Sequence, residues 1–228
     1  VCESHGAMHN EKKAGSFGLI SNFSFFYAHH MSTIEGGMIC TNDNKIYQQA
    51  RMLRSHGMVR EANDATIKEN YYKENPSLHP DFIFSFPAYN VRNTEIGGIM
   101  GLNQLKRLDE NIKRRTVNLH RFLNQLNSEI YRTDFKLEGS SNYAFNLILK
   151  DPNDVLVTRL MEKMKESGVE FRRGSAGGGN QTRQPYLKDI VPDNHHNNFP
   201  DTEHIHFYGF YIRNFPDLKD EEIDDICR

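Results

Sequence analysis

The sequence contains no tryptophan and only three cysteines among its 228 residues. Cys2, Cys40 and Cys227 are widely separated and odd in number, so they predict no disulfide framework and favour a reducing, cytoplasmic compartment. No run of about 18 apolar residues is present, and we therefore expect no membrane span. Neither sign of charge dominates, since the net charge is -2, which argues against nucleic acid as the main partner.

The remaining composition, 37% hydrophobic and 25% charged, is that of an ordinary folded protein. A strand pair is expected over residues 17–26 and a further strand over 36–41. A helix is expected over 44–55, with Asn42 or Asp43 as its N-cap. Residues 60–87 are polar, rich in aromatics and interrupted by three prolines. They predict a long excursion, rather than packed repeat structure, of the kind that often covers a site.

Apolar residues at helical spacing from Thr94 to Leu126 predict one long connector helix or two abutting helices. Beyond it, residues 142–149 predict a strand, 154–167 an amphipathic helix ended by Gly168, and 169–171 another strand. This alternation indicates a smaller α+β domain, and we expect domains at residues 1–114 and 115–228. The chain begins at Val1 without methionine, so it is expected to be an internal piece of a longer protein.

Four short segments near the start carry groups suited to binding a ligand and moving protons. Glycine permits sharp turns and close backbone approach to a ligand. A hydroxyl at a strand end can bind a phosphate oxygen, and a histidine can shuttle protons near neutral pH. Each feature alone is more often structural than functional. The segments are Gly15-Ser16-Phe17-Gly18, Phe23-Ser24-Phe25, His29-His30 and Glu35-Gly36-Gly37-Met38.

Taken in order, these segments resemble the family of sugar aminotransferases and dehydratases that use pyridoxal 5'-phosphate (PLP). The resemblance runs over essentially the whole chain, which looks like the C-terminal part of such a protein. Further matching segments are Thr41-Asn42-Asp43, Arg54-Ser55-His56-Gly57, Ala88 to Ile96, Gly101-Leu102 and Gln104-Leu105.

The resemblance implies an α/β fold: part of the large PLP-binding domain of the aspartate-aminotransferase-like fold type I, followed by a smaller α+β domain. It implies that Ser24 contacts the cofactor phosphate and that Glu3 lies against the cofactor ring. Asn90 matches an asparagine that reaches the phosphate of the neighbouring subunit's cofactor. A homodimer with its active site at the subunit interface is therefore expected.

One position departs from the aminotransferase pattern. His29 stands where most relatives carry the lysine that holds the cofactor covalently, and an imidazole cannot form that bond. A histidine can still move protons, which is the pattern of the deoxysugar 3-dehydratases. The implied reaction is dehydration at C3 of GDP-4-keto-6-deoxy-D-mannose, with the pyridoxamine form (PMP) as working cofactor and L-glutamate as co-substrate, in colitose and O-antigen biosynthesis. Overall resemblance, and no particular residue, indicates GDP as the nucleotide.

Other readings stay open. A nucleotide-sugar 4-aminotransferase of the perosamine synthase type would need a lysine in place of His29. A non-catalytic fragment or dimerisation module would need no site at all. A second dehydratase branch uses an iron–sulfur cluster, which takes about four cysteine ligands, and three scattered cysteines argue against it.

Two more regions carry candidate ligands. Arg172 and Arg173 flank a glycine-rich stretch and, with the weaker candidate Arg183, could grip a carboxylate or diphosphate of the nucleotide-sugar substrate. The pairs His195-His196 and His204/His206 could in principle bind zinc. The second pair lies on an expected helix, however, where residues two apart face different ways, so no metal is expected. At Arg213 relatives usually have glycine, and the change either disturbs a turn or is harmless.

Overall fold

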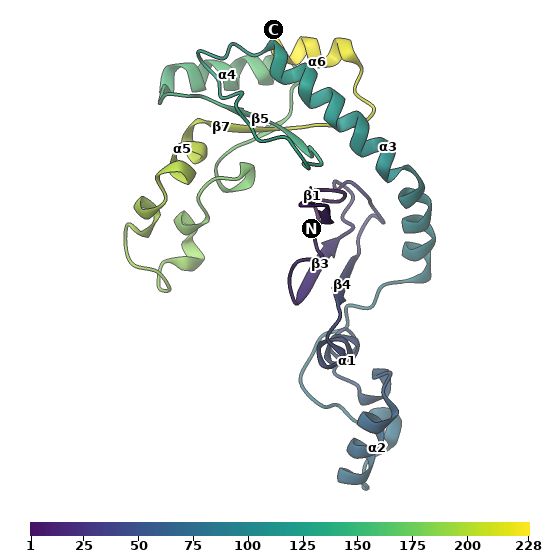
Figure 1. The fold of residues 1–228 in the computed structure, drawn as a ribbon. Helices are drawn as coiled ribbons and strands as arrows, with labels where there is room; N and C mark the ends of the chain where they lie inside the picture. The colour runs from purple at the N-terminus through teal and green to yellow at the C-terminus, as the bar shows by residue number, and fades with distance from the viewer. The chain divides into compact units, whose positions relative to one another are not determined.

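One helix of 31 residues, α3 (Glu95–Gln125), joins the two parts of the chain. The computed structural model describes all residues from 1 to 228 (Figure 1). They divide into two units, Val1–Asp109 and Glu110–Arg228, so that α3 begins in one and ends in the other. The boundary expected from the sequence, between residues 114 and 115, also falls inside this helix and stays a prediction.

The first unit is built around a pair of antiparallel strands, β3 (Ile20–Ser24) and β4 (Gly37–Thr41). Ile20 lies opposite Thr41 and Ser24 opposite Gly37. The strand expected over 36–41 is confirmed, but the strand pair expected over 17–26 is wrong, because that segment forms β3 alone. A smaller pair, β1 (Met8–His9) and β2 (Lys12–Lys13), precedes it.

Helix α1 (Asn44–Leu53) follows β4 directly, as the sequence predicts. The carboxylate of Asp43 accepts a hydrogen bond of 2.9 Å from the backbone N–H of Ile46. This is how an N-cap satisfies one of the free N–H groups of a first turn. The helix buries Gln48, whose Oε1 accepts a 2.7 Å bond from the N–H of Asn63 and so fixes the next segment.

The segment 60–87 is more regular than its sequence suggests. It contains α2 (Ala65–Glu74), capped by the side chain of Asp64, between the short 3₁₀ helices η1 (Val59–Glu61) and η2 (Pro80–Phe82). The sequence predicted this excursion but not the helix within it. The physical reason is that α2 buries none of its residues, so no apolar stripe marks it in the sequence.

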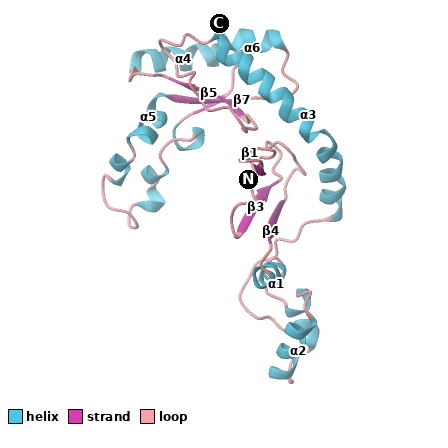
Figure 2. Ribbon diagram, viewed as in Figure 1, coloured by secondary structure: helices cyan, strands magenta, loops and turns pink.

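The second unit has a three-stranded antiparallel sheet in the order β5-β7-β6 (Figure 2). Helices α4 and α6 and the second half of α3 lie along one side of this sheet (Figure 1). The strands and helices expected from the sequence are present, with small shifts at their ends. Their bounds are β5 Ala144–Ile148, α4 Asp154–Glu166, β6 Phe171–Arg172, α5 Pro200–Tyr208, β7 Gly209–Arg213 and α6 Asp220–Cys227. Between β6 and α5 lie the 3₁₀ helices η3 Gly174–Gly177, η4 Gln181–Arg183, η5 Pro185–Leu187 and η6 His195–Asn198.

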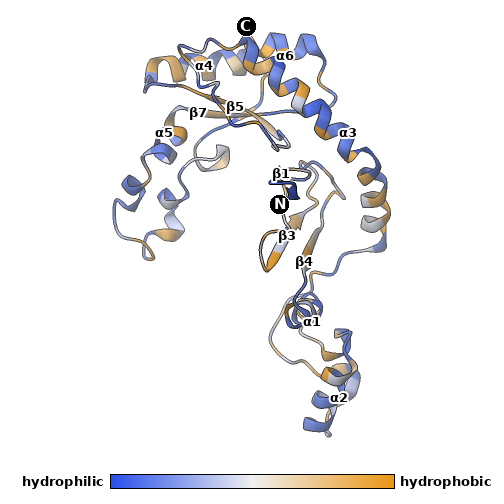
Figure 3. Ribbon diagram, in the orientation of Figure 1, coloured by the Kyte–Doolittle hydropathy of each residue, from blue (hydrophilic) through white to orange (hydrophobic).

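The core of this unit lies between the sheet and these helices, and hydrophobic colour is concentrated on β5 and β7 (Figure 3). The rings of Phe122 and Phe145 stack at its centre with centroids 4.5 Å apart. Burying one such side chain contributes about 1.5–3 kcal/mol, so this contact ties α3 to the sheet. The buried members of the core are Leu119, Phe122, Leu123, Phe145, Leu147, Leu149, Val157, Met164, Phe210, Ile212 and Ile223.

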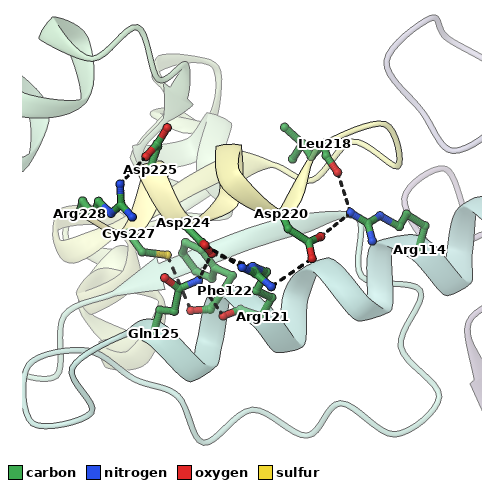
Figure 4. A network of polar contacts seen from close by, with 10 residues as sticks. All are labelled: Arg114, Arg121, Phe122, Gln125, Leu218, Asp220, Asp224, Asp225, Cys227 and Arg228. Carbon is green, nitrogen blue, oxygen red and sulfur yellow. Dashed lines mark hydrogen bonds and ion pairs between the residues drawn. The ribbon is translucent and has the colours of Figure 1, made fainter.

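Charged side chains fasten α6 to α3 (Figure 4). Arg121 forms two parallel bonds of 2.7 Å to the carboxylate of Asp224, from Nε to Oδ1 and from Nη2 to Oδ2. Arg114 and Arg121 both donate to Asp220, at 2.8 and 3.1 Å. The hydrogen bonds from Arg121 lower the pKa of Asp224 to about 2, so this carboxylate is charged at any ordinary pH.

The turn after β7 is held by buried amides. Asn214 is fully buried, and its Nδ2 donates to the carbonyl oxygens of Arg115 and Asn142 at 2.8 and 2.9 Å. Its Oδ1 accepts from Asn118, 3.1 Å away. Arg213, where relatives usually have glycine, is the last residue of β7 and does not have a positive φ. The arginine therefore does not strain the turn.

Candidate functional site

A turn after β3 presents the two adjacent histidines. The N–H of Phe25 donates to the carbonyl oxygen of Gly36, and the N–H of Thr33 donates to that of Phe25, both at 2.8 Å. Inside the turn, the N–H of His29 donates to the carbonyl oxygen of Phe26 at 3.0 Å. Thr33 is buried, and its hydroxyl donates to the carbonyl oxygen of Glu35 at 2.8 Å. These bonds give the turn a defined shape.

His29 is half-buried at the tip of this turn. Its imidazole lies edge-on to the ring of Phe26, with centroids 5.7 Å apart. His30, the next residue, is buried. The turn therefore gives its two histidines different environments: His29 is partly exposed and His30 is packed inside the unit.

Ser24 ends β3 immediately before the turn. Its Oγ accepts a 3.3 Å hydrogen bond from the N–H of Phe26. A hydroxyl that accepts in this way keeps its own hydrogen for a further acceptor, such as a phosphate oxygen. Phe23 and Phe25 point to the opposite face of the strand, because side chains alternate along it.

His5 packs behind the strand and is a residue whose importance the sequence did not reveal. It is 6% exposed, and its Nδ1 lies 3.0 Å from the carbonyl oxygen of Cys2, so Nδ1 carries the hydrogen. Its Nε2 is buried with no hydrogen-bond partner. The rings of Phe23, Phe25 and His30 surround it at centroid distances of 5.5, 6.1 and 6.1 Å.

Burial lowers the pKa of His5, and the ring is therefore neutral around pH 7. The sequence offered one signal, since the whole segment Glu3-Ser4-His5-Gly6, and not Glu3 alone, resembles a segment of the family. Glu3 itself is exposed. Of that segment, it is His5 that joins the start of the chain to the strand and turn.

Asn90 lies on a different segment of the same unit, where it pairs with Ser55 across an isolated antiparallel bridge. Its side chain is exposed, and its Oδ1 accepts a 3.1 Å bond from Nε of Arg92. The amide nitrogen of Asn90 keeps its donors for a ligand. An open pocket lined by His56 and by residues 84–88 lies next in sequence to Ser55 and Asn90.

The three candidate arginines belong to the second unit and differ in how many of their donors are already hydrogen-bonded. Arg183 forms a bidentate ion pair with Glu203 through Nε and Nη2. Arg173 donates to the carbonyl oxygen of Phe207 and to the sulfur of Met161. Arg172 is exposed, with its guanidinium 6.0 Å from the centroid of the Tyr211 ring. Arg172 is thus the arginine whose donors remain available.

No group of three or more histidine, cysteine, aspartate or glutamate side chains is arranged to hold a metal ion. His204 and His206 point different ways on α5: Nε2 of His204 lies 2.6 Å from the carbonyl oxygen of Leu149, while Nδ1 of His206 accepts from the N–H of Asn180. The three cysteines are free thiols. None of the helices combines the length and the apolar character needed to cross a membrane.

Comparison with known proteins gives this geometry a context. The model of the DegT/DnrJ/EryC1/StrS aminotransferase family matches residues 1–228. GDP-4-keto-6-deoxy-D-mannose 3-dehydratase of Escherichia coli O55:H7 is 34% identical over 224 residues, which cover 98% of this chain and 57% of that protein. The chain therefore spans little more than half the length of such a relative.

Solved structures of similar fold point to the same family. The E. coli GDP-4-keto-6-deoxy-D-mannose-3-dehydratase with bound hydrated PLP superposes with a TM-score of 0.83 at 32% identity, covering 100% of this chain and 58% of that one. A GDP-4-keto-6-deoxymannose-3-dehydratase with a trapped PLP-glutamate geminal diamine gives 0.82 at 31% identity, with coverage of 100% and 58%. The expected fold, part of a fold type I large domain followed by a smaller α+β domain, is confirmed.

Proposed function

The chain belongs to the DegT/DnrJ/EryC1/StrS aminotransferase family, and on that premise we propose that it serves the PLP-dependent C3 dehydration of GDP-4-keto-6-deoxy-D-mannose. The observation that carries the proposal is His29 at the tip of the turn after β3. The turn from Phe25 to Thr33 contains no lysine, so nothing in it can attach a cofactor covalently. The similarity to 3-dehydratases over 98% of the chain supports the same reaction.

The residues present fit a phosphorylated cofactor. Ser24 has a hydroxyl hydrogen to donate, at the point where the strand opens into the turn. Asn90 has a free amide nitrogen for a phosphate oxygen of the neighbouring subunit's cofactor. Glu3 is the proposed contact to the cofactor ring, and the neutral His5 packed behind β3 gives this part of the unit a fixed frame.

When bound, PMP would supply an amine able to react with the C4 ketone of the sugar and a ring able to accept electrons. A ring nitrogen of His29 would take up a proton from the carbon that bears this amine and give it to the C3 hydroxyl, which would leave as water. Such acid–base work typically contributes about 10²–10⁴-fold to a rate. L-Glutamate is the proposed co-substrate that restores the amine form. The product would be a 3,6-dideoxy-4-keto sugar, and the setting colitose and O-antigen biosynthesis.

For the substrate we propose Arg172 as the principal contact to the diphosphate. Its guanidinium is exposed and backed by the Tyr211 ring, whereas Arg183 is paired with Glu203 and Arg173 is bonded inside the unit. Arginine suits this work because its planar fork matches phosphate oxygens. Arg173 and Arg183 are then less suited to direct contact than the sequence suggests.

The working form is proposed to be a cytoplasmic homodimer, since Asn90 is exposed and would serve the partner's cofactor. The alternative reaction, transfer of an amino group to C4, requires a lysine where His29 stands. A non-catalytic dimerisation module would make no use of the hydroxyl of Ser24 or the imidazole of His29.

Absorbance tests the proposal. Addition of PLP and then L-glutamate to the purified protein should replace the aldehyde band of the cofactor by the pyridoxamine band. Addition of GDP-4-keto-6-deoxy-D-mannose should then release ammonia and give a product without its C3 hydroxyl. Absence of any spectral change would contradict cofactor binding, while a 4-amino sugar as product would support the aminotransferase reading.

A further inference from the structure

A glycine-rich loop, Gly174–Asn180, wraps around one side chain of α5. We call it the glycine loop. The backbone N–H of Asn180 donates to Nδ1 of His206 at 3.1 Å. Because Nδ1 accepts this bond, the neutral ring carries its hydrogen on Nε2. One end of the loop is therefore fastened to a titratable group.

The fit between the loop and this ring is close. A Cβ on Gly179 would lie 2.7 Å from Nδ1 of His206 and 2.7 Å from the carbonyl carbon of Gly174. A Cβ on Gly174, where φ is +57°, would lie 3.2 Å from Cε1 of the same ring. These glycines are thus needed for packing, and the loop is not a flexible grip for a ligand.

The side chain of Asn180 adds a second attachment to α5. Asn180 is 2% exposed, and its Nδ2 donates to Oε1 of Glu203 at 2.8 Å and to the carbonyl oxygen of His196 at 3.1 Å. Its Oδ1 accepts from the N–H and hydroxyl of Thr182. Glu203 also receives the fork of Arg183. Glu203 and His206, one helical turn apart, therefore hold the same end of the loop.

The other end of the loop begins two residues after Arg172, the last residue of β6. A Cβ on Gly177 would lie 2.9 Å from the carbonyl oxygen of Arg172 and 3.5 Å from Cβ of Tyr211. The loop thus folds back onto the backbone of Arg172 and lies beside Cβ of Tyr211, the residue whose ring backs the Arg172 guanidinium. Loosening of the loop would remove this contact with the Arg172 backbone, whereas the pairing of Arg172 with Tyr211 between β6 and β7 would stay.

We propose that Glu203 and His206 are positioning residues: they fix the glycine loop and, through it, hold Arg172 ready for the diphosphate of the substrate. The role assigned to Arg172 rests on the proposed function, whereas the fixing of the loop does not. Neither Glu203 nor His206 is a contact to substrate in this account.

The same geometry makes the loop sensitive to acid. Protonation of His206 places a hydrogen on Nδ1 and removes the acceptor for Asn180. The charged groups facing this ring are Arg183, Arg173 and Glu203. Burial and the two arginines lower the pKa of His206, against the opposing effect of Glu203. The pKa of His206 in the folded protein lies below its ordinary value of 6.5. The hydrogen bond from Asn180 to His206 is therefore intact at neutral pH and is lost as the pH falls through the folded pKa.

Hydrogen exchange at the amide of Asn180, in the intact protein and corrected for the intrinsic effect of pH, tests the attachment. In the wild type, protection should fall as the pH is lowered below 6.5, the ordinary pKa of histidine, because the pKa of His206 is lowered from that value. His206→Leu should lower protection at neutral pH by roughly 3- to 10-fold, the equivalent of one hydrogen bond, and should match the wild type at a pH where His206 is protonated. His206→Asn offers an amide oxygen near the place of Nδ1 and should keep protection while removing its pH dependence. The exposed His120→Asn is the matched control and should behave as wild type.

Unchanged protection in His206→Leu would overturn the proposal, and so would a pH dependence that survives in His206→Asn. In the active holoprotein, Glu203→Gln and His206→Leu should raise KM for the nucleotide sugar several-fold with little change in kcat or in the cofactor spectrum. A loosened loop with an unchanged KM would overturn the positioning role. If the protein lacks dehydratase activity, the exchange result still stands, so failure of the proposed function is distinguishable from failure of this inference.

Discussion

The backbone N–H of Thr33 donates a 2.8 Å hydrogen bond to the carbonyl oxygen of Phe25, and this bond closes the turn that carries His29. Phe25 also donates to Gly36, so one residue is bonded to both sides of the turn. The imidazole that we assign to proton transfer is thus placed by backbone bonds from β3 and from the segment leading into β4. Rigid placement of an acid–base group is what such catalysis needs.

Gly36 should be indispensable to this turn. Its φ is +154°, and a Cβ there would lie 2.5 Å from Oγ1 of Thr33. Gly36→Ala should therefore lower the free energy of unfolding by more than about 1 kcal/mol and displace the turn. Urea unfolding of the two proteins measures the loss.

Gly98→Ala is the matched control for that change. Gly98 lies in α3, and a Cβ there meets nothing within 4 Å. Alanine should stabilise this helix position by up to about 1 kcal/mol. Equal effects of the two substitutions would show that the turn does not constrain Gly36.

Acid should weaken the attachment of α6 through Asp224. The pKa of this carboxyl is about 2 in the folded protein, against an ordinary value of 3.8. A carboxyl with a lowered folded pKa contributes stability above its unfolded pKa, and that contribution is lost as the pH falls towards the folded value. The free energy of unfolding of the wild type should therefore fall between pH 3.8 and about 2 more steeply than that of Asp224→Asn.

Denaturant unfolding at a series of pH values makes this measurement. Asp189→Asn, a change at an exposed loop position, serves as control and should leave the acid limb as it is in the wild type. Parallel acid limbs in the wild type and Asp224→Asn would contradict the stabilising role of the Arg121 fork.

Cys227 should be a slow thiol in the folded protein. Burial raises its pKa to about 11, so at pH 8 roughly one thiol in a thousand is the reactive thiolate. Iodoacetamide at pH 8 should label Cys227 far more slowly in the folded protein than in urea, as followed by peptide mass spectrometry. Rapid labelling without denaturant would show that the packing of α6 against α3 does not cover this side chain.

Much of this structure was predictable because local signals and tertiary packing agree. Asp43 caps α1, and the stripe of α3 buries Phe122 at its end. The helix α2 was missed because it buries none of its residues, so no apolar stripe marks it in the sequence. The order of the four short segments between Gly15 and Met38 predicted that Ser24 and His29 lie on one strand and the turn after it. None of these segments alone would have predicted it.

The sequence could not predict which of the three arginines stays available for a ligand, nor that α5 holds the glycine loop. Arg172 and Arg173 are neighbours in the chain, yet only the folded sheet sets Arg172 on Tyr211 and Arg173 on Phe207. Glu203 lies 20 residues from its partner Arg183, and no spacing rule links them. The same holds for His206 and Asn180, which meet only because the loop folds back on α5.

The most direct test of the central claim is the comparison of His29→Asn with wild type in the holoprotein. Asparagine keeps a polar side chain but cannot carry a proton at neutral pH. The variant should keep the cofactor absorbance and lose C3 dehydration by at least about 10²-fold, while the exposed His9→Asn retains it. Dehydration at the wild-type rate in His29→Asn would contradict the assignment of proton transfer to His29.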